Sequence, residues 1–84
     1  MNCEDLQNHF YGEIAIEQKD DNLIVIASNE RETLSNELLN DLLFQGLTLK
    51  RIELHYQYED KETGEHWNNG ILWEFVPMNA LLIQ

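Results

Sequence analysis

Cysteine, proline, glycine and long apolar runs are all scarce in this chain of 84 residues, and each shortage excludes something. A single cysteine, Cys3, cannot form an intrachain disulfide, which favours a reducing compartment. One proline and four glycines leave no room for a linker. No apolar run approaches the roughly 20 residues that span a bilayer. We therefore expect one compact cytoplasmic domain over residues 1–84, with no signal peptide and no membrane contact.

Positive charge is the most informative shortage. Five Lys and Arg stand against sixteen Asp and Glu, which gives a formal net charge of −11. Direct nucleic-acid binding draws on clusters of Lys and Arg, so we do not expect it here. The apolar content of 43% is ordinary for a folded protein, so the acidity does not indicate disorder. The charge points to a basic partner, or it serves only solubility.

Hydrophobic periodicity in the first half of the chain predicts a short helix, a β-hairpin and a longer helix. Residues 3–11 place apolar side chains three to four positions apart, and residues 13–18 and 23–28 read as strands. Asn29 and Glu32 resemble a capping box, and a glycine at position 46 resembles a helix end. The main helix is therefore predicted over Asn29–Gly46. Its apolar face would contain Leu34, Leu38, Leu39, Leu42 and Leu43.

The second half predicts a long hairpin with strands over 48–59 and 65–76, joined by a turn that contains Gly64. Symmetry about this turn predicts the apolar pairs Tyr58–Trp67, Leu54–Ile71 and Ile52–Trp73. Asn69-Gly70 could form a bulge, and residues 78–83 could add a short edge strand. A sheet face turned away from the main helix would carry Leu23, Val25, Ala27, Leu72 and Val76.

The predicted fold class is thus a small α+β domain of (α)ββαββ order. Its sheet would be mostly antiparallel, with the main helix packed on it. A β-grasp-like arrangement is compatible with this order. Either the N-terminal helix covers this sheet face or a partner does, which leaves two assembly states open, a monomer or a homodimer.

Motifs for catalysis or metal binding are absent from the sequence. Cys3 and the histidines at 9, 55 and 66 do not have the spacing of a zinc site. The acidic turn near residue 60 lacks the alternating ligands of a calcium loop. Cys3 and His9 could act as nucleophile and base, but a thiol on a buried helix stripe would be inert. We expect no enzyme, no cofactor and no metal, with a small enzyme or metal protein as the least favoured alternative.

Carboxylates placed at regular steps give the sharper hypothesis. On the predicted helix Glu30, Glu37 and Asp41 fall within about 40° of one another. Such rows can stand in for a phosphate backbone before a basic groove. Further carboxylates would line the first strand and the tip of the long hairpin: Glu13, Glu17, Glu59, Asp60, Glu62 and Glu65.

Phe44 projects outside the leucine stripe, beside this acidic row. An exposed aromatic with a charged rim would suit an interface anchor. The alternative is that Phe44 folds back onto Leu47 or the C-terminal strand as satellite core.

Two functional hypotheses lead. The first is a small acidic inhibitor of the anti-defence or immunity type, which occupies the basic site of a nucleic-acid-handling protein as a nucleic-acid mimic. The second is an adaptor that binds a protein partner through its sheet, with the acidity serving only solubility.

Overall fold

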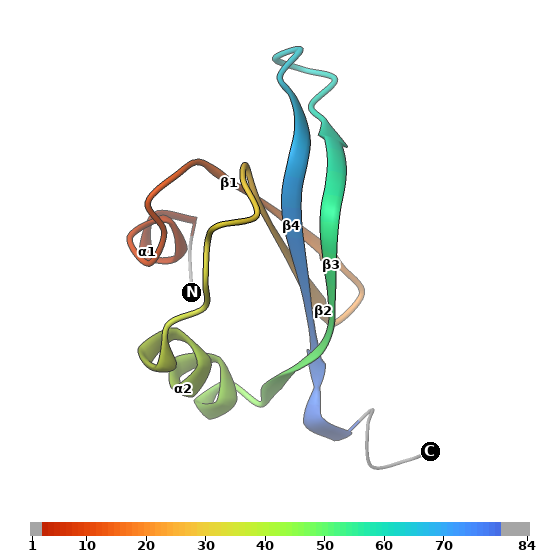
Figure 1. Cartoon of the computed structure of the whole chain (residues 1–84). Coiled ribbons are helices and arrows are strands. Elements are labelled where there is room, and N and C mark those ends of the chain that lie inside the picture. The colour runs from red at the N-terminus through yellow and green to blue at the C-terminus, as the bar shows by residue number, and fades with distance from the viewer. Residues whose placement is uncertain (1–2, 80–84) are drawn as a thin grey trace.

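Four strands form one antiparallel sheet, and two helices lie against one of its faces (Figure 1). The computed structural model describes residues 3–79. The elements are α1 (Cys3–Gln7), β1 (Ile14–Lys19), β2 (Asn22–Ala27), α2 (Asn36–Phe44), β3 (Leu47–Glu59) and β4 (His66–Pro77). The predicted α+β class and the αββαββ order are confirmed. Most of the strand suggested over 78–83 lies outside the described residues.

The strand order in the sheet is β1-β2-β4-β3, which the sequence pattern left open. Each neighbouring pair is antiparallel. A β-grasp sheet has a parallel central pair, so the likeness to that fold is limited to the element order. The β3–β4 hairpin extends well beyond the β1–β2 pair (Figure 1), so the sheet has a broad base and a narrow two-stranded arm.

The register of the β3–β4 hairpin agrees with two of the three predicted pairs. Tyr58 pairs with Trp67, and Ile52 pairs with Trp73. The predicted pair at Leu54 is not formed, because the register shifts between Glu53 and Tyr56. A further shift follows between Tyr56 and Tyr58, opposite the Asn69-Gly70 dipeptide that suggested a bulge.

The hydrophobic core lies between the two helices and one sheet face. It joins side chains from α1 and the turn after it, and from α2, β2 and β4: Leu6, Phe10, Leu23, Val25, Ala27, Leu38, Leu42, Ile71, Trp73 and Phe75. The prediction that Leu23, Val25 and Ala27 face away from the main helix was therefore wrong. β2 pairs with β4 in a register that places Val25 opposite Trp73, and cross-strand partners share a face.

The main helix is shorter than predicted. It begins at Asn36, with Ser35 as N-cap: the Ser35 hydroxyl accepts a hydrogen bond from the Leu38 N–H at 3.1 Å. The predicted start at Asn29 was wrong, because Glu32 does not form the capping box. Both of its carboxylate oxygens instead accept backbone N–H groups from the turn after α1.

The end of α2 matches the prediction. Gly46 follows the helix with φ of 83°, a left-handed conformation that glycine adopts without steric cost. Its N–H donates to the Leu43 carbonyl at 2.9 Å, and its own carbonyl accepts the Met78 N–H at 2.8 Å. The end of β4 is thereby held beside the end of α2.

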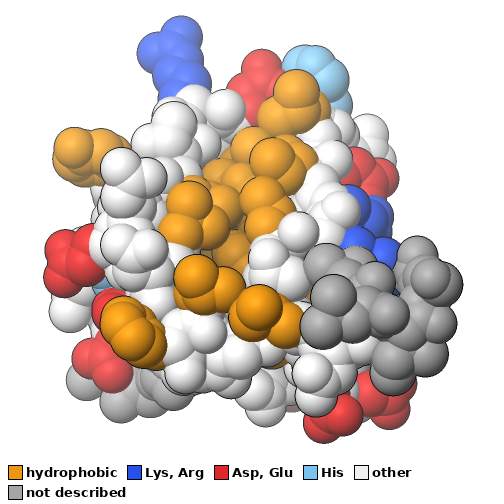
Figure 2. All heavy atoms as spheres, turned by 90° about the horizontal axis from the view of Figure 1, so that it is seen from below, with side chains coloured by type: hydrophobic (Ala, Val, Ile, Leu, Met, Phe, Trp, Pro, Cys, Tyr) orange, Lys and Arg blue, Asp and Glu red, His pale blue; other side chains and the backbone are white. Residues whose placement is uncertain are grey.

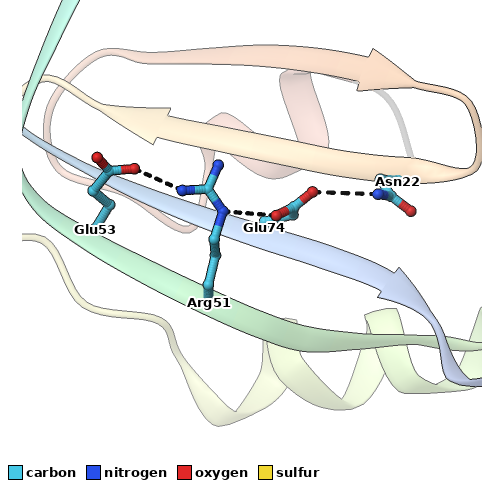
Figure 3. A network of polar contacts seen from close by, with 4 residues as sticks. All are labelled: Asn22, Arg51, Glu53 and Glu74. Carbon is cyan, nitrogen blue, oxygen red and sulfur yellow. Dashed lines mark hydrogen bonds and ion pairs between the residues drawn. The ribbon is translucent and has the colours of Figure 1, made fainter. Parts of the chain in front are cut away.

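The opposite sheet face carries a row of polar contacts between three strands (Figure 3). Arg51 donates to Glu53 and to Glu74, both at 2.7 Å, and Asn22 donates to Glu74 at 3.2 Å. The Arg51 guanidinium lowers the pKa of the Glu74 carboxyl, and Glu74 in turn raises the pKa of Arg51. This network fixes β3 against β4 and β2.

Candidate functional site

The outward side of α2 exposes an aromatic and an aliphatic side chain at its C-terminal end. Phe44 is 91% exposed and Leu43 is 49% exposed. The predicted leucine face is therefore narrower than expected: Leu38 and Leu42 are fully buried, but Leu43 is not. The satellite-core alternative for Phe44 was wrong, because a ring that folded onto Leu47 would lose most of its exposed surface.

Two of the three predicted helix carboxylates lie together. Glu37 and Asp41 stand one helical turn apart on α2 and line one hollow of about 430 Å³. Asp5, Asn8 and His9 line the same hollow from the α1 side. The side chains of Glu37 and Asp41 make no hydrogen bond or ion pair within the described part of the chain. Their charge is thus available to an incoming group.

The proximity of α1 to this hollow was not foreseen from the sequence. His9 Nδ1 and the Ser35 hydroxyl are hydrogen-bonded at 3.2 Å, which ties the turn after α1 to the start of α2. Contacts between segments 26 residues apart leave no local signal in a sequence pattern. Only the capping preference of serine could have indicated one of the two partners.

Glu30 does not belong to this surface, so its predicted place beside Glu37 was wrong. It precedes α2 in the loop after β2, and its carboxylate lies 2.9 Å from His55 Nδ1 on β3. The helical projection failed because residues 29–35 are not helical. Glu30 therefore connects the loop to the edge strand.

The hairpin tip holds three exposed carboxylates and one that closes the turn. Asp60 accepts the backbone N–H groups of Glu62 and Thr63, at 2.9 and 3.4 Å. This contact closes the turn, and the predicted role of Asp60 in partner binding stays a prediction. The predicted carboxylates that are exposed at the tip are Glu59, Glu62 and Glu65.

The pKa of Tyr58 is affected by the carboxylates of the hairpin tip. Burial raises the pKa of its phenol above the ordinary 10.0, and nearby carboxylates raise that pKa further. These carboxylates belong to Asp60, Glu17, Glu65 and Glu62. Glu17 is on β1, so the field at Tyr58 combines charge from both hairpins. Glu13, the other predicted carboxylate of that region, lies just before β1 and is exposed.

Among the described residues, no three His, Cys, Asp or Glu side chains are arranged to hold a metal ion. The Cys3 side chain lies outside the described set, so the structure does not place the Cys3–His9 pair. None of the helices within residues 3–79 is long and apolar enough to cross a bilayer.

Comparisons with protein-family models, with curated proteins and with solved structures found no match for this chain. The surface of α2 combines three features: an exposed aromatic at the end of the helix, an adjacent apolar hollow, and two carboxylates without partners in the described residues.

Proposed function

We propose that this chain is a small protein-binding inhibitor that occupies the basic site of a nucleic-acid-handling protein in the cytoplasm. The carboxylates Glu37 and Asp41 on α2 take the place of nucleic-acid phosphates, and Phe44 acts as the anchor. The observation that carries this proposal is the exposure of Phe44 on the same helix as these two carboxylates. Aromatic anchors beside charged rims are typical of protein interfaces.

Two further observations support the proposal. The carboxylates are on a helix whose packed leucines hold it in place, which lowers the conformational entropy lost on binding. The net charge of −11 would also steer a basic partner toward the chain at long range. The acidic arm around Tyr58 extends this field.

The test is competition with nucleic acid. The tagged chain captures partners from a nuclease-treated bacterial lysate at low salt, and each candidate is then purified. We expect the chain to displace a labelled duplex from the partner, and we expect its affinity to fall steeply with salt, because screening weakens pairing between exposed charges. A partner that keeps its duplex while it is bound to this chain would contradict the proposal.

Charge reversal on α2 supplies the matched comparison. Glu37→Lys with Asp41→Lys should weaken partner binding at least about a hundredfold, since two charge contacts become repulsive. Asp20→Lys with Asp21→Lys makes the same change in net charge in the turn between β1 and β2, where both side chains are exposed, and should weaken partner binding much less. Equal losses from both double variants would mean that only net charge matters.

A second candidate is an adaptor that binds through the edge strand β3. It is favoured by Ile52 and Leu54, which are 54% and 57% exposed. The register shifts in β3 argue against it, because bulges disrupt an edge that another strand would need. An adaptor would bind in a salt-tolerant manner and lose its partner on Ile52→Ser.

A further inference from the structure

An apolar groove runs between α2 and the start of β3. Its lining comes from both elements and from β4: Leu39, Asn40, Leu43, Leu47, Thr48, Leu49 and Phe75. The volume of this hollow is about 270 Å³. A second hollow of about 330 Å³ is lined by Asn40, Leu43 and Phe44. The two hollows share Asn40 and Leu43, so they lie side by side on this face.

The surface around the groove combines apolar and acidic groups. Figure 2, which views the molecule from below Figure 1, shows hydrophobic side chains gathered at the middle of this face and acidic side chains at its edges. Glu37 and Asp41 stand on α2, the helix that forms one wall of the groove.

The size of the groove limits its occupant. Pockets for drug-sized ligands are usually about 300–1,000 Å³, so these two hollows lie at the lower limit of that range and suit small groups such as single side chains. Among the described residues, the polar side-chain groups of the lining are an amide and a hydroxyl, from Asn40 and Thr48. Apolar side chains of a protein partner fit this chemistry better than a polar metabolite does.

We propose that the groove receives apolar side chains of a basic amphipathic helix, whose Lys or Arg residues contact Glu37 and Asp41. This inference rests on the proposed function and names the partner element that the surface takes. A helix fits better than a strand because the register shifts along β3 interrupt the edge that a strand would extend. Helices with apolar anchors one turn apart commonly dock into such grooves.

Charge argues against a second copy of this chain as the occupant. Docking of two copies at this groove would bring the carboxylates of two α2 helices together and double the net charge of −11. A basic helix reverses the sign of both effects.

The probe is a synthetic helical peptide of about four turns, with leucines on one face and lysines elsewhere. A peptide of the same composition, in which the leucines are spread around the helix, is its control. We expect amide signals of residues 39–49 to shift in NMR titrations with the first peptide. Leu43→Ser should weaken its binding at least about tenfold, which corresponds to about 1.4 kcal/mol.

Ile52→Ser is the matched variant, because Ile52 is as exposed as Leu43 but does not line the groove. It should leave peptide affinity unchanged within about twofold. Equal weakening by both variants, or equal binding of both peptides, would overturn the proposal. Circular dichroism of each variant confirms that the fold is kept.

Other occupants give distinct results. A dimer in sedimentation velocity that Leu43→Ser dissociates would assign the groove to a second copy. Tighter peptide binding after removal of residues 80–84 would assign it to the end of this chain. Either result would overturn the helix proposal.

The inference and the proposed function can fail separately. Peptide binding could persist in Leu43→Ser but be lost in Glu37→Lys with Asp41→Lys. That result would contradict docking in the groove and would still support the acidic surface as a binding site. Binding that is lost in Leu43→Ser but persists in Glu37→Lys with Asp41→Lys would support the groove as a docking site and contradict the phosphate-mimic function.

Discussion

Replacing Glu32 with alanine tests how the turn after α1 is held to the loop before α2. Glu32 is only 4% exposed. One carboxylate oxygen accepts the Gly12 N–H at 2.7 Å, and the other accepts the Tyr11 N–H at 3.2 Å. These bonds join segments 20 and 21 residues apart. Alanine removes both acceptors at once.

The expected cost follows from the two bonds. A hydrogen bond to a charged group contributes about 1.5–3 kcal/mol, and water can partly replace the acceptor at Tyr11, whose side chain is fully exposed. We expect Glu32→Ala to lower the free energy of unfolding by about 2–4 kcal/mol. A domain of this length has about 4–13 kcal/mol in total, so the melting temperature should fall by at least about 8 °C.

Urea unfolding followed by tryptophan fluorescence measures this loss, because Trp73 is buried against Phe10 with ring centroids 5.5 Å apart. Glu32→Gln, whose amide oxygen can replace only one acceptor, should fall between wild type and alanine. Glu30→Ala is the control, since the exposed contact of Glu30 with His55 should contribute less than about 1 kcal/mol. Equal stability of Glu32→Ala and Glu30→Ala would refute the reasoning.

Two further predictions concern the sheet. Gly70→Ala should destabilise the domain by about 1–3 kcal/mol in the same assay, because a Cβ there would lie 2.7 Å from the Ala27 carbonyl oxygen. Asn69→Ala, on the exposed neighbour, should cost much less. The Arg51 guanidinium lowers the folded pKa of Glu74 below the ordinary 4.5, so this contact stabilises the fold above that value and is lost as pH falls through the folded pKa. The difference in unfolding free energy between wild type and Glu74→Gln should therefore be constant near neutral pH and shrink below about pH 4.5; a difference independent of pH would contradict it.

The extent of α2 shows what local patterns could and could not predict. The C-terminal end was predictable, because a glycine in the left-handed conformation depends only on its neighbours in the chain. The start of the helix was not predictable, because the local sequence at Asn29 and Glu32 fits a capping box. In the folded chain the Glu32 carboxylate binds a turn that is distant in the sequence, through the N–H groups of Tyr11 and Gly12. Ser35, also a favoured N-cap residue, was the correct signal in the same stretch.

The faces of β2 were unpredictable for a related reason. Its residues are apolar on both sides, so alternation did not say which side meets the helices. The pairing of Val25 with Trp73 settles the question, and that pairing joins residues far apart in the sequence. In the β3–β4 hairpin the partners are close in sequence. There, symmetry about the turn was enough to predict the pairs of Tyr58 and Ile52, and it failed only where the register shifts.

The same distinction changes what the net charge means. Several carboxylates that count toward −11 are committed to the fold: Glu32 and Asp60 hold backbone N–H groups, and Glu74 holds Arg51. Composition cannot separate these from carboxylates that face solvent without a partner. A binding surface also needs exposed apolar groups beside the carboxylates, because burial of apolar surface supplies much of the free energy of binding. On α2 the carboxylates of Glu37 and Asp41 share one helix with the exposed ring of Phe44, and for this reason the functional proposal is built there and not on charge alone.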